Sequence, residues 1–347
     1  MIDNNAAVLL IYTGGTIGMI ENPETGALHS FDFSHLKQYV PELKRFHFKI
    51  DTIQFDPPID SSDMDLEGWS KLVRIIQKSY ESYDGFVILH GTDTMAYSAS
   101  ALSFMLKNLN KPVVLTGSQL PIGKIRTDGK ENLITALEIA VDKDPDGKAI
   151  VPEVCVFFQT YLMRGNRTTK VNVENFRAFN SYNYPILAKA GLRIRYDRNL
   201  INRASELPTE FYSRFDPNVM ILKIFPGMSI EIVRSIFGNP NLKGVVLETF
   251  GAGNFPDRKD FLEIIRAAVK RNIIIVNVTQ CSSGSVEMNR YRSGLILANT
   301  GILSGHDMTT EAAVTKMMFL LGQKLSVEEV KSRMTQSIIG ELTIDNP

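Results

Sequence analysis

Short apolar runs alternate with segments of helical period through the first half of the chain. The runs that predict buried strands are rich in β-branched residues and lie at 7–12, 86–90, 112–115 and 153–158. The segments that predict helices lie at 66–80, 94–106 and 131–141. Strands separated by helices, each ending in a glycine and a hydroxyl residue, predict a mostly parallel α/β sheet. In such a sheet the ligand binds at the carboxyl ends of the strands.

The pattern lapses between residues 196 and 217, where polar residues show no apolar period and Pro208 and Pro217 interrupt the segment. Further predicted strands and helices lie at 219–225, 230–237, 244–247, 257–271 and 273–278, and two helices close the chain. Ser326 and Glu329 form a capping box for the last helix. We predict a larger N-terminal α/β domain at 1–195, an interdomain linker at 196–217 and a smaller parallel α/β domain at 218–347.

Composition narrows the class of protein. Lys plus Arg and Asp plus Glu both number 38, so the formal net charge is zero and no global field favours nucleic acid or an anionic membrane. No secretory signal and no membrane-spanning run is visible in the sequence. Cys155 and Cys281 both fall in apolar runs, which predicts buried thiols in a reducing cytoplasm without a disulfide. The histidines are scattered, so we expect no metal, and no cofactor is expected.

The first predicted strand runs into a glycine turn between two threonines, Thr13-Gly14-Gly15-Thr16. Glycines without a Cβ let the backbone turn sharply and approach a ligand closely. A hydroxyl held beside bare N–H groups at a strand end suits a nucleophile or an anion cradle, although a turn with a chance threonine fits equally well. The turn does not match the dinucleotide-binding fingerprint, because Thr13 stands where Gly-x-Gly-x-x-Gly needs its first glycine.

Two further polar segments lie where a predicted helix begins. Segment 90–94 (HGTDT) supplies a second hydroxyl and a carboxylate, but Thr92 or Asp93 is also suited to cap the helix that follows. Segment 60–64 (DSSDM) indicates a polar pocket wall, or a cap in which Asp63 is the best candidate.

Two more segments complete the polar set. Segment 116–121 (TGSQLP) is another strand-end loop, for which a supporting role is expected. Segment 164–170 (RGNRTTK) is basic, and a solvated loop is the usual interpretation of such a run.

A threonine hydroxyl is a weak nucleophile at neutral pH and needs a neighbouring base, which a lysine can supply if burial or positive charge lowers its pKa. The sequence contains no Gly-x-Ser-x-Gly motif, so no motif in it supports a serine hydrolase.

The two motifs TGGTIGM at 13–19 and HGTDT at 90–94 strongly resemble those of the bacterial-type L-asparaginases. Segment 164–170 and Thr279-Gln280-Cys281 resemble the cytoplasmic type I branch in particular. The resemblance covers about Val8 to Thr343. It implies two α/β domains, no nucleic acid or membrane partner, a homodimer or homotetramer, and hydrolysis of L-asparagine to L-aspartate and ammonia in asparagine catabolism.

The resemblance also implies roles for single residues. Thr16 would be the nucleophile that forms an acyl-enzyme ester, with Thr92, Asp93 and Lys170 as the second catalytic group. The residues that would hold the α-amino and α-carboxylate groups of the substrate are Asp60, Ser61, Ser62, Thr92 and Asp93. Some type I enzymes bind a second, regulatory asparagine, and Thr279 and Cys281 match residues of that site.

The sequence departs from the family pattern at two places. Many members carry a tyrosine in the loop after the first motif, whereas residues 21–29 contain none. Lys170 acting through water, or another hydroxyl, would then activate the nucleophile. The regulatory site also contains an arginine at a position where this chain has Glu248, unless Arg290 or Arg292 replaces it.

Three alternatives to an asparaginase stay open at this point. The first is a glutaminase, or an amidohydrolase that supplies ammonia to a transfer-RNA amidotransferase. A nucleotide-binding module is a more remote alternative. An inactive family member used as a scaffold is opposed by the joint presence of Thr16, Thr92, Asp93 and Lys170.

Overall fold

The apolar run Ala7–Tyr12 forms strand β1 in the computed structural model, which describes residues 6–21, 28–30, 38, 40–288 and 292–344. The last five residues of β1 are buried, so both faces of the strand are covered. β1 pairs in parallel with β4 (Lys49–Gln54) on one side and with β5 (Gly85–Leu89) on the other. This burial on both faces explains why the strand is a continuous apolar run without alternation.

The main sheet of the first unit contains eight strands in the order β13-β12-β9-β8-β7-β5-β1-β4. Neighbouring strands from β4 to β8 pair in parallel, and β9, β12 and β13 continue the sheet antiparallel. The remaining strands are β7 (Val113–Thr116), β8 (Val154–Phe158), β9 (Tyr161–Arg164), β12 (Ala188–Lys189) and β13 (Arg195–Tyr196). The prediction of a mostly parallel α/β sheet is confirmed.

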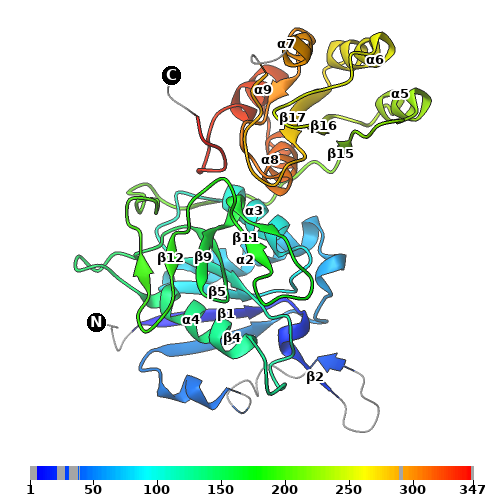
Figure 1. Cartoon of the computed structure of the whole chain (residues 1–347). Coiled ribbons are helices and arrows are strands. Elements are labelled where there is room, and N and C mark those ends of the chain that lie inside the picture. The colour runs from blue at the N-terminus through cyan, green and yellow to red at the C-terminus, as the bar shows by residue number, and fades with distance from the viewer. Residues whose placement is uncertain (1–5, 22–27, 31–37, 39, 289–291, 345–347) are drawn as a thin grey trace. The chain divides into compact units, whose positions relative to one another are not determined.

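Helices cover this sheet (Figure 1) and lie close to their predicted positions: α2 (Leu66–Ser79), α3 (Met95–Met105) and α4 (Gly129–Val141). Leu133 and Leu137 of α4 share one buried cluster with Val8 and Leu10 of β1. The cap of α2 was predicted wrongly. Its N-cap is Asp65, whose carboxylate accepts the Gly68 N–H, because the chain first makes a separate turn at residues 61–63.

Short elements complete the first unit. The two-stranded ribbons pair β2 (Met19–Glu21) with β3 (Leu28–Ser30), β10 (Thr169–Lys170) with β11 (Phe179–Asn180), and β6 (Leu106–Lys107) with β14 (Glu210–Phe211). The 3-10 helices are η1 (Thr16–Gly18), η3 (Pro41–Arg45), η4 (Ser61–Asp63), η5 (Tyr80–Ser82) and η6 (Gly165–Arg167).

The chain forms two compact units, 1–213 and 214–347. Residues 196–213 of the predicted linker belong to the first unit, where Tyr196 pairs with Ala188 and Phe211 pairs with Leu106. The boundaries 1–195, 196–217 and 218–347 stay a prediction.

The second unit is built on a parallel sheet in the order β15-β16-β17-β18, as predicted for a smaller α/β unit. Its strands are β15 (Val219–Lys223), β16 (Gly244–Thr249), β17 (Ile274–Thr279) and β18 (Leu303–Ser304). Its helices are α5 (Ile230–Gly238), α6 (Lys259–Lys270), α7 (Arg292–Ala298), α8 (Thr310–Gly322) and α9 (Val327–Met334). The predicted capping box of Ser326 and Glu329 is present at the start of α9.

A buried ion pair fastens the end of the chain to α8. Lys316 Nζ lies 2.6 Å from Glu341 Oε1, and both side chains are fully buried. The ammonium also donates to the carbonyls of Met334 and Gln336. The carboxylate accepts the backbone N–H groups of Ile338 and Ile339. Every donor of the ammonium therefore has an acceptor, which is what makes a buried charge tolerable.

The two cysteines differ in their surroundings. Cys155 is a buried free thiol within β8, as predicted, and burial raises the pKa of its thiol. Cys281 is an exposed free thiol. The prediction of burial fails there because β17 ends at Thr279, before the cysteine. Within the described part of the chain, no helix combines the length and the apolar character that a membrane span needs.

Candidate active site

Three loops meet at the carboxyl ends of β1 and β5, because these strands pair with Tyr12 opposite Leu89. Gly15, at φ +92°, lies so close to Gly91 that a Cβ on Gly15 would sit 2.5 Å from the Gly91 Cα. A Cβ on Gly91 would in turn sit 2.5 Å from Ser61 Oγ. Glycine is therefore required at both positions, and it brings together the loops that carry Thr16, Ser61 and Thr92.

The two threonines of the first motif have different environments. Thr13 is buried, and its hydroxyl donates to the Leu89 carbonyl at 3.1 Å. Thr16 is half-buried at the start of η1, and its hydroxyl has no hydrogen-bond partner among the residues that the structure describes. Of the two threonines, Thr16 is therefore the one whose hydroxyl the described residues leave unengaged.

Lys170 reaches the second motif from a different part of the chain. Its Nζ donates to Thr92 Oγ1 at 2.8 Å and lies 2.6 Å from Asp93 Oδ1. The lysine side chain is 16% exposed and the aspartate side chain 64%, so the pair lies at the rim of the site. Neither Thr92 nor Asp93 caps α3; Thr94 is the N-cap residue, without a side-chain cap bond. The alternative interpretation, in which Thr92 or Asp93 caps this helix, is therefore wrong.

The basic segment before Lys170 is not a solvated loop, contrary to the usual interpretation of such a run. Arg164 and Glu153 form an ion pair of 2.6 Å, and each side chain is only 4% exposed. The Arg164 guanidinium also lies over the Tyr184 ring, 4.3 Å from its centroid. Arg167 is buried and lies over the same ring. These contacts fix the backbone that delivers Lys170 to Thr92 and Asp93.

The predicted substrate-binding residues Asp60, Ser61 and Ser62 lie at the turn η4. The Asp60 carboxylate accepts both the N–H and the hydroxyl of Ser62 at 2.8 Å, which lowers the pKa of Asp60. Ser61 is buried against the loop of the second motif, and its carbonyl accepts the Thr94 hydroxyl at 2.5 Å. Ser61 thus contacts the loop of the second motif, and a substrate-binding role for Asp60, Ser61 and Ser62 stays a prediction.

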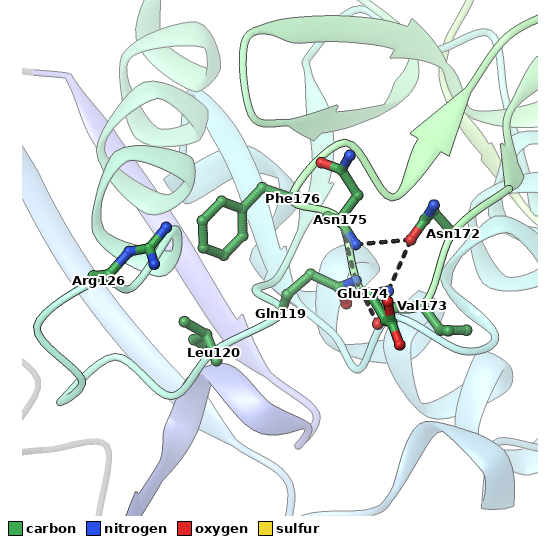
Figure 2. A pocket seen from close by; sticks show the side chains of 8 residues that line it. All are labelled: Gln119, Leu120, Arg126, Asn172, Val173, Glu174, Asn175 and Phe176. Atoms are coloured by element: carbon green, nitrogen blue, oxygen red, sulfur yellow. Dashed lines mark hydrogen bonds between the residues drawn. The ribbon is translucent and has the colours of Figure 1, made fainter.

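A pocket of about 770 Å³ lies beside the second motif, within the size range of small-molecule sites. Its lining residues, shown in Figure 2, are Gln119, Leu120, Arg126, Asn172, Val173, Glu174, Asn175 and Phe176. Gln119 joins the pocket to the site: its amide donates to the Val173 and Asn175 carbonyls, and its Oε1 lies 3.4 Å from Thr92 Oγ1. Residues 172–176 carry no recognisable motif, so the sequence does not predict their place in the pocket wall.

The residues compared with a regulatory site lie in the second unit. The Thr279 hydroxyl donates to the Gly251 carbonyl at 2.7 Å and accepts the Cys281 N–H. Glu248 accepts the Thr310 hydroxyl at 2.5 Å and lies 3.6 Å from Lys223 Nζ. A regulatory role for this group stays a prediction.

Other features of the predicted site fall on residues that are not described. Arg290 and most of the loop at 21–29 lie outside the described residues, and of Arg292 only the backbone is described.

A threonine hydroxyl that no described residue engages and a lysine–aspartate pair, both carried by loops at strand ends of an α/β unit, are the groups that an amidohydrolase of the threonine-nucleophile class needs. Residues 7–202 match the family described as "Asparaginase, N-terminal", and residues 218–334 match the "Glutaminase/Asparaginase C-terminal domain". The chain therefore belongs to the asparaginase family.

Individual relatives agree with this assignment. The chain is 42% identical to L-asparaginase 1 of Escherichia coli (strain K12), covering 98% of this chain and 99% of that protein. It is 42% identical to the 60 kDa lysophospholipase of Mus musculus, but it spans only 62% of that protein's length. The crystal structure of L-asparaginase I from Vibrio cholerae matches with a TM-score of 0.88 at 39% identity, covering 98% of this chain and 100% of that one.

Proposed function

We propose that the protein is an L-asparaginase, which hydrolyses the side-chain amide of L-asparagine to give L-aspartate and ammonia. The observation that carries this proposal is the free hydroxyl of Thr16 beside a loop in which Lys170 contacts both Thr92 and Asp93. The similarity to L-asparaginase 1 over nearly the whole of both chains supports the choice of substrate.

In the proposed reaction, Thr16 Oγ1 attacks the amide carbon and gives up its proton. The C–N bond then breaks, the amide nitrogen gains a proton, and ammonia leaves an ester on Thr16. Water cleaves the ester, which releases aspartate and restores the hydroxyl. We assign the proton transfers to Lys170, Thr92 and Asp93 as one unit, acting directly or through water.

The oxygen that becomes negative during the attack needs a hydrogen-bond donor. The Thr92 N–H donates to no group among the described residues, so it is available for this role. For the rest of the substrate, Ser61 and Ser62 suit the α-carboxylate as donors, and Asp60 and Asp93 suit the α-ammonium as acceptors. Asp93 is exposed enough to contact both Lys170 and the substrate.

A steady-state assay of ammonia release from asparagine and from glutamine tests the proposal. We expect turnover with asparagine and aspartate as the product identified by mass spectrometry. Preferential release from glutamine would favour the glutaminase alternative. The absence of turnover with both amides, together with binding of NAD or ATP, would favour the nucleotide-binding alternative.

We also propose a homodimer or homotetramer in the cytoplasm, with 1–195 and 218–347 as domains and 196–217 as their linker. The family resemblance supports the oligomer, and the exposed free thiol of Cys281 suits a reducing compartment. Light scattering at micromolar concentration tests the assembly, and a single monomer mass would refute it.

A further inference from the structure

His90 is a buried histidine next to the second motif that the proposed reaction does not use. Its ring is 1% exposed, and each ring nitrogen has one polar partner. Nδ1 lies 2.7 Å from the Gly91 carbonyl oxygen, and Nε2 lies 2.8 Å from Ser98 Oγ in α3. Ser98 Oγ also accepts the indole N–H of Trp69, from α2, at 2.9 Å. A chain of three hydrogen bonds therefore runs from α2 through α3 to Gly91.

The directions of these hydrogen bonds determine the tautomer of His90. An indole N–H can only donate, so Ser98 accepts from Trp69 and has its own proton to give. The Gly91 carbonyl oxygen can only accept, so Nδ1 carries the ring proton and donates it there, and Nε2 accepts the Ser98 proton. The opposite tautomer would place the Nδ1 lone pair against a carbonyl oxygen 2.7 Å away. Burial lowers the pKa of His90 to about 4, so the ring is neutral at pH 7.

The Gly91 carbonyl belongs to the peptide that supplies the Thr92 N–H. This peptide is trans, so its C=O and N–H point in opposite directions. The carbonyl is held by His90, and the Thr92 N–H consequently points away from the ring, where it remains without a partner among the described residues. Rotation of this peptide would turn the N–H away from its present direction and bring the carbonyl in its place.

We propose that His90 is a positioning residue, which fixes the Gly91–Thr92 peptide through its Nδ1–H and thereby keeps the Thr92 N–H directed at the reacting oxygen. Ser98, which accepts from Trp69, supports this tautomer by donating its own proton to Nε2. The proposal rests on the proposed function, since it assigns the N–H to the amide hydrolysis. The competing explanation is a core histidine whose two hydrogen bonds only stabilise the fold.

Two substitutions separate these explanations, because an asparagine amide can occupy the place of Nδ1 and a glutamine amide the place of Nε2. His90→Asn should keep most of kcat for asparagine, since it can still donate to Gly91. His90→Gln should lower kcat by about 10- to 100-fold with little change in KM, as expected for a mispositioned oxyanion donor. Melting temperatures of the two variants should fall by similar amounts.

Two results would overturn the proposal. One is a His90→Gln variant with the kcat of the wild type. The other is a loss of kcat that follows the loss of melting temperature alike in both variants. If the wild-type protein itself releases no ammonia from asparagine or glutamine, the proposed function fails, which is a different outcome.

A measurement independent of activity tests the tautomer. In protein labelled with ¹⁵N-histidine, long-range ¹H–¹⁵N correlation spectra distinguish a protonated ring nitrogen from an unprotonated one. The His90 signals, identified by their loss in His90→Asn, should show a protonated Nδ1 and an unprotonated Nε2. A protonated Nε2 would refute the proposal. Trp69 is the sole tryptophan, so its fluorescence reports whether the surrounding core stays intact in each variant.

Discussion

The hydroxyl of Thr13 donates to the carbonyl oxygen of Leu89 at 3.1 Å, and the same oxygen accepts the Thr13 N–H at 3.0 Å. Thr13 is thereby bound to the neighbouring strand by both its backbone and its side chain. Thr16, three residues later, has left the sheet and its hydroxyl is not engaged by the described residues. We therefore predict different effects for substitutions at these two threonines of one motif.

Replacing Thr16 with valine keeps the shape of the side chain and removes the hydroxyl. Thr16→Val should abolish turnover, a loss of about 4 kcal/mol or more in transition-state stabilisation, while the melting temperature stays close to that of the wild type. Thr13→Val is the matched control. It should cost about 1 kcal/mol of stability for one hydrogen bond and retain activity. Activity of the wild-type level in Thr16→Val would exclude Thr16 as the nucleophile.

Lys170 and Asp93 should act as one unit, because a single ammonium contacts both Asp93 and Thr92. Lys170→Met should lose most of kcat, and adding Asp93→Asn should cost little more than the first change alone. A double-mutant cycle on kcat/KM measures the coupling. Fully additive losses would instead indicate separate roles, with Asp93 binding substrate and Lys170 acting independently.

The buried ion pair of Arg164 and Glu153 should stabilise the folded protein. Glu153→Gln leaves the Arg164 guanidinium buried without its counter-charge, and we expect a loss of about 3–5 kcal/mol in the free energy of unfolding. Denaturation with urea measures this loss. Lys107→Met, which breaks an exposed ion pair with Glu210, is the control and should cost less than about 1 kcal/mol. Equal effects of the two variants would contradict the structural role of the buried pair.

His90 should make stability depend on pH. Its pKa is about 4 in the folded protein and about 6.5 in the unfolded chain, so between these values only the unfolded chain binds the proton. The free energy of unfolding should therefore fall as pH decreases through this window, by about 2 kcal/mol between pH 7 and pH 5 from this residue. Urea denaturation of the wild type and of His90→Asn at both pH values measures the difference. An identical pH dependence of the two proteins would contradict the prediction.

The dependence of rate on asparagine should be hyperbolic. By the family resemblance, Glu248 would occupy the position at which the regulatory site of some type I enzymes has an arginine, and its carboxylate would repel the α-carboxylate of a second asparagine. Since coupling requires that the effector bind two states with different affinity, loss of the main anchor removes most of it. A Hill coefficient clearly above one would contradict this, and its loss in Arg290→Ala or Arg292→Ala would show which residue replaces the anchor.

Local patterns predicted the elements of the fold well. The strand at 7–12 and the helix that begins at Ile230 start where the apolar runs start, because a buried strand or helix face must be apolar along its length. The meeting of the glycine turn with the loop at 90–94 also followed from the sequence, since parallel strands end at one edge of the sheet.

What the sequence did not predict depends on partners that are distant in the chain. No residue near Arg164 in the sequence indicates that Glu153 neutralises its charge. The basic run therefore predicted a solvated loop, whereas the structure has a buried ion pair. The hydrogen bonds around the His90 ring involve Ser98 and Trp69, which lie in two different helices. Pocket residues 172–176 form a loop without a recognisable motif, and it is Gln119 that contacts them and Thr92.

The buried pair of Lys316 and Glu341 has a consequence for the lifetime of the protein in a cell. A cut between Lys316 and Glu341 would separate the two partners in the chain, and loss of Glu341 would leave an ammonium buried in the second unit without its counter-charge. Removing one partner of a buried pair typically destabilises a protein by about 3–5 kcal/mol, enough to raise the unfolded population severalfold or more. Glu341 is therefore a position at which loss of one carboxylate destabilises the second unit from within.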